Sequence, residues 1–162
     1  MLLVANFAVT KLLLHDEQLY QRVCEKLLKQ VSREEFPIYG VEISPKHVEG
    51  ARRNAQSAGV LDTVRIIEGD ATRLESFLTV SPEKVVVNLP YGIRSARPKA
   101  LAKLYGGLLS SLSRFAGGCV LVAITAASRQ FKESANNAGV SIVEERRVLH
   151  GNLEVSVFKC LV

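Results

Sequence analysis

Lys84-Val85-Val86-Val87-Asn88 is followed directly by Leu89-Pro90-Tyr91-Gly92, so an apolar segment in the middle of the chain runs into a turn. The valine-rich half predicts a β-strand, and its unbroken run of three valines predicts burial on both faces. Pro90 and Gly92 predict that the chain turns after Asn88. Strands buried on both faces are typical of parallel sheets, so this segment indicates an α/β fold.

Other apolar, β-rich segments alternate with helical patterns on both sides of this strand. Upstream, strands are predicted at residues 38–41 and 64–68, with a helix between them that begins at Ser44-Pro45 and ends at Gly59. An earlier helix is predicted at residues 16–33, where Tyr20, Val23, Leu27 and Val31 share one face. Downstream, helices at residues 98–114 and 128–138 flank a strand at residues 118–124. In the first of these helices we expect five residues to face inward, namely Leu101, Leu104, Leu108, Leu112 and Phe115.

The last two predicted strands cover residues 142–149 and 153–162 and are separated only by a short turn at His150-Gly151-Asn152. So short a connection cannot join parallel strands, so the pair is expected to form an antiparallel hairpin. The sequence therefore predicts one domain over residues 1–162, with a mostly parallel sheet that ends in this hairpin.

The composition is that of a globular protein with a basic surplus. Hydrophobic residues make up 48% of the 162 residues, which is enough for a core, and no apolar run approaches the length of a membrane span. We expect no signal peptide, no membrane association and a cytoplasmic protein whose three cysteines stay reduced. The net charge is +5, and residues 37–162 hold 16 of the 21 basic but only 11 of the 16 acidic side chains. This surplus indicates a polyanionic partner such as RNA.

Two acidic residues follow predicted strands, where open α/β sheets bind their ligands. Glu42 is suited to accept hydrogen bonds from a ribose diol, and Ile43 beside it could pack on an adenine ring. Asp70 could accept from an adenine amine while the Ala71 amide donates to a ring nitrogen. The structural alternatives are an acid near a helix N-terminus for Glu42, and a turn capped by Asp70.

The loop from Asn88 to Tyr91 is suited to hold an exocyclic amine of a nucleic-acid base. Such an amine is a poor nucleophile because its lone pair is delocalised into the ring. The Asn88 side-chain oxygen and the Leu89 carbonyl can accept its two hydrogens and stabilise the charge that develops as the nitrogen attacks a methyl group. Pro90 stiffens the loop, and Tyr91 offers a ring for stacking on an extruded base. The structural alternative is a strand end capped by asparagine.

Four basic residues follow this loop and could hold the phosphates that flank the base, namely Arg94, Arg97, Lys99 and Lys103. The alternative is a solvated helix face. The three histidines have no metal-ligand spacing, and no metal site is expected.

Residues 37–162 resemble the catalytic domain of tRNA guanine-N2 methyltransferases that carry a THUMP RNA-binding domain, and of the RNA methylases related to them. The matching segments are Ile38-Tyr39-Gly40-Val41-Glu42, Gly69-Asp70-Ala71, Asn88 through Arg94, Leu104-Tyr105 and His150-Gly151-Asn152-Leu153. This resemblance implies a class I, Rossmann-like methyltransferase fold and S-adenosylmethionine as cofactor. It places Glu42 at the cofactor ribose, Asp70 and Ala71 at its adenine, and Asn88, Leu89, Pro90 and Tyr91 at the target amine, with Asn88 also beside the cofactor. The implied substrate is a guanine in tRNA.

Two features of that family are missing from the sequence. The family has a glycine-rich loop before the position of Glu42, but the first glycine of this chain is Gly40. The THUMP domain has no counterpart either. We therefore expect an N-terminally incomplete methyltransferase core preceded by a divergent helical segment at residues 1–36, with a second polypeptide as a candidate source of the missing part. The alternative is a non-catalytic module of the same fold that binds RNA or a partner subunit.

Overall fold

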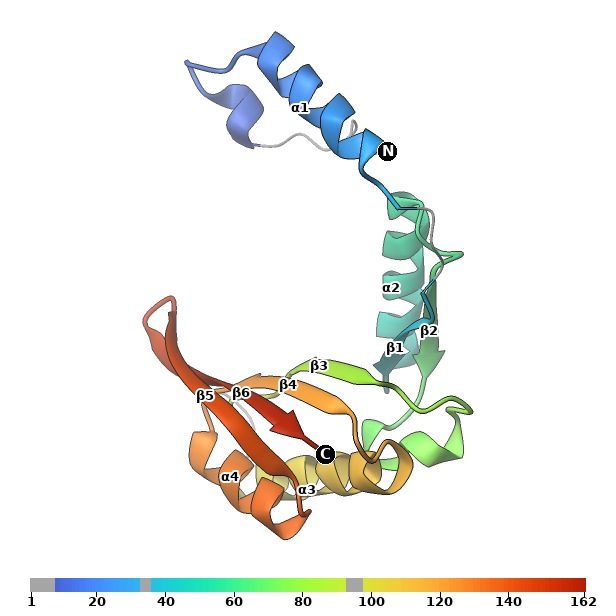
Figure 1. Cartoon of the computed structure of the whole chain (residues 1–162), viewed down its shortest axis with the longest axis vertical. Helices are drawn as coiled ribbons and strands as arrows, with labels where there is room; N and C mark the ends of the chain where they lie inside the picture. The colour runs from blue at the N-terminus through green and yellow to red at the C-terminus, as the bar shows by residue number, and fades with distance from the viewer. Residues whose placement is uncertain (1–7, 33–35, 93–97) are drawn as a thin grey trace. The chain divides into compact units, whose positions relative to one another are not determined.

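The computed structural model describes residues 8–32, 36–92 and 98–162, and the chain divides into two compact units after Glu68 (Figure 1). Within the described residues no helix is long and apolar enough to cross a membrane. The expectation of a single domain over residues 1–162 stays a prediction. The first unit contains η2 (Ala8–Lys11), α1 (Glu17–Lys29), β1 (Ile38–Glu42), α2 (Pro45–Ala58) and β2 (Val64–Glu68). The second contains η3 (Ala71–Ser76), β3 (Lys84–Asn88), α3 (Pro98–Phe115), β4 (Val120–Thr125), α4 (Ser128–Asn137), β5 (Ser141–His150) and β6 (Leu153–Leu161).

In the first unit β1 and β2 pair in parallel, and α2 connects them and packs against them. The predicted start and end of α2 are confirmed. Pro45 occupies its first turn after the N-cap residue Ser44, and Gly59 ends it with φ 68°, a left-handed conformation that favours glycine. The register aligns Glu42 with Glu68, so both strands end in a carboxylate.

Helix α1 is confirmed, although it ends at Lys29 rather than at residue 33. Its N-cap is Asp16, whose carboxylate accepts from the Leu19 amide at 2.9 Å. The apolar face predicted from the sequence is present, but none of the residues of α1 is buried. Val23 and Leu27 on that face are both about half exposed. The periodicity therefore predicted the helix correctly without predicting a packing partner for it.

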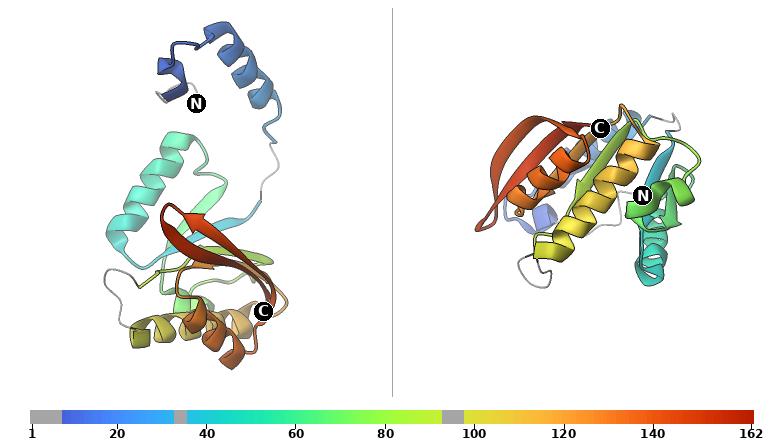
Figure 2. Two further views of the ribbon diagram at one scale, coloured as in Figure 1. Left: turned by 90° about the vertical axis from the view of Figure 1, so that its left-hand side faces the viewer. Right: turned by 90° about the horizontal axis from the view of Figure 1, so that it is seen from below.

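The second unit is built on a four-stranded sheet in the order β3-β4-β6-β5. β3 and β4 are parallel, whereas β6 is antiparallel to both β4 and β5. The predicted C-terminal hairpin is thus confirmed, with His150 paired to Leu153 across a turn that contains Gly151 at φ 65°. Both α3 and α4 lie on the same face of this sheet (Figure 1 and Figure 2).

The prediction that β3 is buried on both faces is wrong. Val86 is 82% exposed, while its neighbours Val85 and Val87 are half-buried. Side chains alternate between the faces of a strand, so Val86 lies on the other face from Val85 and Val87. Helices α3 and α4 cover only one face of this sheet (Figure 1). A run of valines therefore reflected β propensity rather than burial on two sides.

The core of the second unit is an aromatic cluster between the helices and the sheet. Phe131 of α4 stacks on Phe158 of β6 with ring centroids 4.5 Å apart, and Tyr105 of α3 meets Phe131 edge-on at 6.2 Å. All three side chains are fully buried. Leu104 was expected to face inward but is 37% exposed, because the buried stripe of α3 runs through Leu101 and Tyr105 at helical spacing.

Candidate active site

The loop after β3 begins as a continuation of the sheet. Asn88 aligns with Ile124 of β4, and the Leu89 amide donates to the Ile124 carbonyl at 3.0 Å. The Leu89 side chain is buried, so the loop is anchored to the core. Val87 pairs with Ala123, which is fully buried, so these two residues lie on the covered face of the sheet. Asn88 follows Val87 in the strand, so its side chain lies on the other face, where it is exposed.

The acceptors expected to hold an amine are both available. In the described part of the chain, no hydrogen bond engages the Asn88 side chain or the Leu89 carbonyl. The next carbonyl, that of Pro90, accepts instead from the hydroxyl of the buried Tyr105. A side-chain amide oxygen and an adjacent backbone carbonyl can together accept the two hydrogens of one amine.

Tyr91 contacts the tip of the C-terminal hairpin. Its hydroxyl lies 3.4 Å from His150 Nδ1, and the two rings meet nearly at right angles with centroids 6.3 Å apart. Residues 148–155 pair only with each other, beyond the end of β4, and so extend from the sheet as a two-stranded ribbon. In the sequence His150 is predicted only to lie in the hairpin turn and not to bind a metal, and only the tertiary structure brings it to Tyr91.

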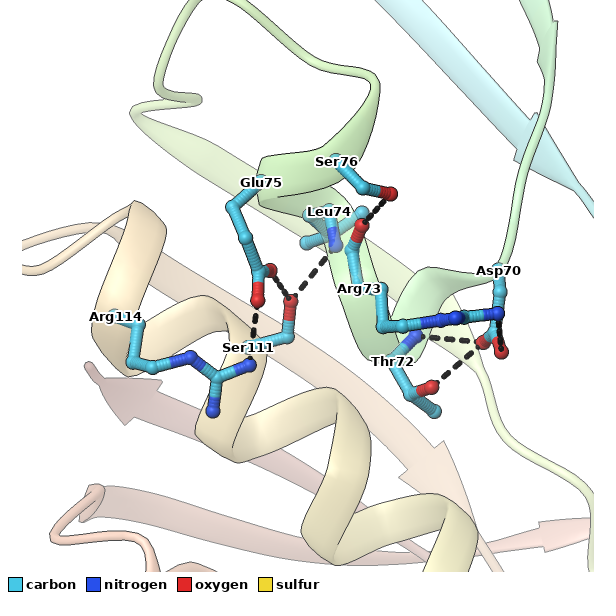
Figure 3. A network of polar contacts seen from close by, with 8 residues as sticks. All are labelled: Asp70, Thr72, Arg73, Leu74, Glu75, Ser76, Ser111 and Arg114. Carbon is cyan, nitrogen blue, oxygen red and sulfur yellow. Dashed lines mark hydrogen bonds and ion pairs between the residues drawn. The ribbon is translucent and has the colours of Figure 1, made fainter.

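Asp70 caps the turn that leads into η3 (Figure 3). Its Oδ1 accepts from the Thr72 amide at 2.9 Å and from the Thr72 hydroxyl at 2.8 Å, and Oδ2 lies 3.8 Å from the Arg73 guanidinium. These hydrogen bonds lower the pKa of Asp70. The structural alternative considered for this residue is therefore realised, and its role at a cofactor adenine, with Ala71, stays a prediction.

Gly69 packs closely against the ring of Phe77. A Cβ atom at this position would lie 2.6 to 2.8 Å from the ring of Phe77, closer than carbon atoms can approach. The structure therefore gives a packing reason for glycine at this position, which is that the Phe77 ring occupies the space of a Cβ atom.

The segment after Asp70 is held against α3 by a polar network (Figure 3). The Ser111 hydroxyl accepts from the Leu74 amide at 2.8 Å and donates to Glu75 Oε2 at 2.7 Å. Arg114 donates to Glu75 Oε1 at 2.7 Å. Hydrogen bonds from Arg114 and Ser111 lower the pKa of Glu75 to about 2. The network fixes η3, and with it the position of the Asp70 turn, relative to α3.

Glu42, in the first unit, retains one oxygen for a ligand. Its Oε1 accepts from the Ser44 amide at 2.8 Å and lies 3.6 Å from His47 Nδ1. Among the described residues nothing hydrogen-bonds Oε2, so that oxygen can accept from a ribose hydroxyl. Ile43 beside it is 67% exposed, which leaves its side chain free to contact an adenine ring. The open carboxylate oxygen of Glu42 and the exposed apolar side chain of Ile43 thus fit a ribose hydroxyl and an adenine ring, and their role at the cofactor stays a prediction.

The basic residues proposed to hold RNA are only partly described. Lys99 and Lys103 lie on the first turns of α3 and are exposed. Arg94 and Arg97 lie outside the described residues. Exposure is what a phosphate-binding lysine needs, but it is equally typical of a solvated helix face, so this role also stays a prediction.

Comparison with known proteins gives the family and its relatives. The family model of the RMKL-like methyltransferase domain matches residues 4–156. The chain is 34% identical over 137 residues to the tRNA (guanine(6)-N2)-methyltransferase of Methanocaldococcus jannaschii, covering 83% of the chain and 36% of that protein. It is 37% identical over 140 residues to the enzyme of the same name from Archaeoglobus fulgidus, covering 83% of the chain and 34% of that protein. The chain thus spans about a third of the length of these curated relatives.

The fold is shared with solved structures of low sequence identity. The crystal structure of SMU.472 complexed with SAH superimposes with a TM-score of 0.75 at 23% identity, covering 96% of this chain and 40% of that one. The predicted α/β methyltransferase fold with its C-terminal antiparallel hairpin is therefore confirmed.

Proposed function

The chain belongs to the family of RMKL-like methyltransferase domains, and we propose that it transfers a methyl group from S-adenosylmethionine to an exocyclic amine of an RNA base. The observation that carries the proposal is a pair of hydrogen-bond acceptors, the Asn88 side-chain oxygen and the Leu89 carbonyl. Both lie where β3 ends beside β4, and neither accepts a hydrogen bond from the described residues. An amine that binds at the end of a strand requires two hydrogen-bond acceptors that have no other partner.

The mechanism assigns separate tasks to the residues of the loop. S-adenosylmethionine, when bound, supplies an electrophilic methyl group. The Asn88 side-chain oxygen and the Leu89 carbonyl each accept a hydrogen bond from the amine, which holds the nitrogen and favours the tetrahedral geometry it adopts as it attacks. The nitrogen bonds to the methyl carbon as the methyl–sulfur bond breaks with its electron pair left on sulfur, and one N–H proton is then released to water. The partial negative charge of the two acceptors stabilises the positive charge that develops on nitrogen, so they act mainly on the transition state. Tyr91 offers its ring to the extruded base, and Pro90 restricts the backbone between them.

Apart from Asn88, which we also place beside the cofactor, cofactor recognition is assigned to residues outside this loop. We assign the cofactor ribose to Glu42, whose Oε2 is open, and the adenine to Ile43, Asp70 and Ala71. Asp70 can take part through Oδ2, because the turn already uses Oδ1. Oδ2 faces Arg73 at 3.8 Å, which is longer than a hydrogen bond.

The target we propose is N2 of a guanine in tRNA, and the partner is therefore RNA. Two relatives with more than 30% identity bear the name tRNA (guanine(6)-N2)-methyltransferase. The net charge of +5 favours a polyanionic substrate. We place the reaction in the cytoplasm, which is supported by three free cysteines.

The experiment that tests this proposal compares two tRNA transcripts that differ by one amino group. One carries guanosine at the target position and the other carries inosine, which lacks the exocyclic amine but keeps the rest of the base. Incubation of each transcript with methyl-labelled S-adenosylmethionine, the chain and the partner polypeptide proposed below should label only the guanosine transcript. Equal labelling of both transcripts would mean that the methyl group goes to another atom, and the proposal would be wrong.

We also propose that a second polypeptide completes the cofactor site. The support is the absence of any glycine before Gly40 in the sequence, because a glycine-rich loop would otherwise let the backbone approach the cofactor. Calorimetric titration of the purified chain with S-adenosylmethionine tests this point. Absence of binding at millimolar cofactor is the expected result, and micromolar binding by the chain alone would refute the need for a partner.

A further inference from the structure

Tyr105 places a buried hydroxyl group against the loop that follows β3. This hydroxyl donates to the Pro90 carbonyl oxygen and lies 2.8 Å from Thr125 Oγ1. Thr125, the last residue of β4, is fully buried like Tyr105, and its oxygen accepts from the Ala127 amide at 3.0 Å. A chain of hydrogen bonds therefore connects the segment before α4, the end of β4, the middle of α3 and the Asn88–Tyr91 loop.

The two ends of this chain of hydrogen bonds determine which group donates in each bond. The Ala127 amide can only donate, and the Pro90 carbonyl can only accept. Thr125 must therefore donate to Tyr105, and Tyr105 must donate to Pro90. Burial raises the pKa of Tyr105, so its hydroxyl keeps the proton that it donates. When successive buried hydrogen bonds all donate in the same direction, each bond polarises the next and strengthens it.

This chain of hydrogen bonds also restricts the orientation of the Leu89 carbonyl. On its N-terminal side the Leu89 amide is tied to Ile124, and on its C-terminal side the Pro90 carbonyl is tied to Tyr105. The Leu89 carbonyl lies between these two anchors, and the Pro90 ring restricts φ within the same short segment. The orientation of the Leu89 carbonyl is thereby set by groups that do not themselves face a ligand.

Packing alone does not account for a tyrosine at this position. The ring of Tyr105 contacts Phe131 edge-on, a contact that a phenylalanine would make equally well. Among the described residues, the partners of this hydroxyl are the Pro90 carbonyl and Thr125 Oγ1. A buried hydroxyl is retained at little cost only when both partners are in place.

We propose that Tyr105 is a positioning residue, oriented by Thr125, which holds the Leu89 carbonyl in the direction that accepts a hydrogen of the target amine. The proposal rests on the proposed function for the identity of the ligand. It adds a residue that touches neither base nor cofactor and acts through the backbone of the loop. A misplacement of about 1 Å in such a group can lower a rate about 100-fold.

The test compares variants of the chain that each lose one hydroxyl, assayed together with the partner polypeptide that completes the cofactor site. Tyr105→Phe keeps the ring and is expected to lower kcat by about 10- to 100-fold, since the acceptor loses its orientation. Thr125→Val should have a similar effect, and Thr125→Ser, which keeps the hydroxyl, should restore most of the activity. KM for RNA and the affinity for S-adenosylmethionine should change by less than about threefold, because ground-state contacts remain.

Ser113→Ala is the matched control. It removes from the same helix a hydroxyl that donates to a backbone carbonyl, that of Ala138, at 3.1 Å and away from the loop. It should cost stability but leave kcat unchanged. Unchanged kcat in Tyr105→Phe, or an equal loss of kcat in Ser113→Ala, would overturn the proposal.

Amide hydrogen exchange separates this proposal from the proposed function. Tyr105→Phe should speed exchange at Leu89, whose amide bonds to Ile124, by about tenfold more than at Leu121 in the centre of β4, since the opening is local. If the wild-type chain methylates no RNA, the proposed function fails, yet faster exchange confined to Leu89 still supports the positioning role. Equal effects at Leu89 and Leu121 would overturn it whatever the activity.

Discussion

Replacing Asn88 separates the amine-holding role of this side chain from any role in folding. Asn88→Leu removes the acceptor oxygen while keeping a side chain of similar size, and Asn88→Asp keeps an oxygen that can accept. Asn88 is exposed and hydrogen-bonds to nothing in the described residues, so both variants should stay within about 0.5 kcal/mol of the wild-type stability. Loss of one preorganised hydrogen-bonding group costs about 2.7–4 kcal/mol of transition-state stabilisation, or about 100- to 1,000-fold in kcat.

The assay is single-turnover methyl transfer to tRNA by each variant together with the partner polypeptide proposed above, with cofactor titration of the same mixture and urea denaturation of each variant alongside. We expect Asn88→Leu to lose activity by that factor with unchanged affinity for S-adenosylmethionine, and Asn88→Asp to keep more activity than Asn88→Leu. A loss of cofactor affinity as large as the loss of rate would mean that Asn88 serves the cofactor rather than the amine. Full activity of Asn88→Leu would refute the assignment of the loop.

The remaining predictions concern stability and pH, measured by denaturant unfolding. Gly69→Ala should destabilise the protein by about 1–3 kcal/mol because its Cβ would meet the Phe77 ring, whereas Gly106→Ala, with nothing within 4 Å, should stabilise it by up to about 1 kcal/mol; a reversed order would refute the packing argument. Phe131→Ala should cost about 3–5 kcal/mol because the ring is fully buried between Phe158 and Tyr105, and a loss below about 1 kcal/mol would contradict the described core. The pKa of Glu75 is lowered from 4.5 to about 2 in the folded state, so its contribution is present above pH 4.5 and lost as the pH falls toward 2. Stability should therefore fall less steeply over that range in Glu75→Gln, and an unchanged slope would contradict the ion pair with Arg114.

The order and type of the secondary-structure elements could be predicted from the sequence because local signals agree with the tertiary structure. Ser44-Pro45 and Gly59 bound α2 in the structure as they do in the sequence pattern. The short turn at Gly151 required an antiparallel hairpin, which the pairing of His150 with Leu153 confirms. Capping and turn chemistry act within a few residues, so one sequence is sufficient to find them.

Burial could not be predicted in the same way, because it depends on which face of an element is covered. Val86 and Leu104 were both expected to be buried and are exposed. The sheet of the second unit has helices on one face, and the stripe of α3 passes through Tyr105 rather than Leu104. Apolar residues on both faces of an element leave its orientation undetermined until the neighbouring elements are known.

Some residues of the candidate site could likewise be predicted from local sequence signals, and others could not. Asn88 and Leu89 could be found because their chemistry and their place after a strand are both local. Tyr105 and His150 reach the same loop from 15 and 59 residues away along the chain, and their contacts with it could not be predicted from local sequence signals. Asp70 shows the opposite case, since its local alternative, the turn cap, is the arrangement that the structure contains.

The most direct test of the central claim is the chemical identity of the methylated nucleoside. tRNA is incubated with the chain and S-adenosylmethionine, together with any partner polypeptide that the reaction requires, then digested to nucleosides and separated by mass spectrometry against standards. The acceptors at Asn88 and Leu89 predict N2-methylguanosine, and Asn88→Leu should remove that product. A product methylated on a ring nitrogen or on a ribose hydroxyl would contradict the account, because neither atom carries the two hydrogens that these acceptors are placed to bind.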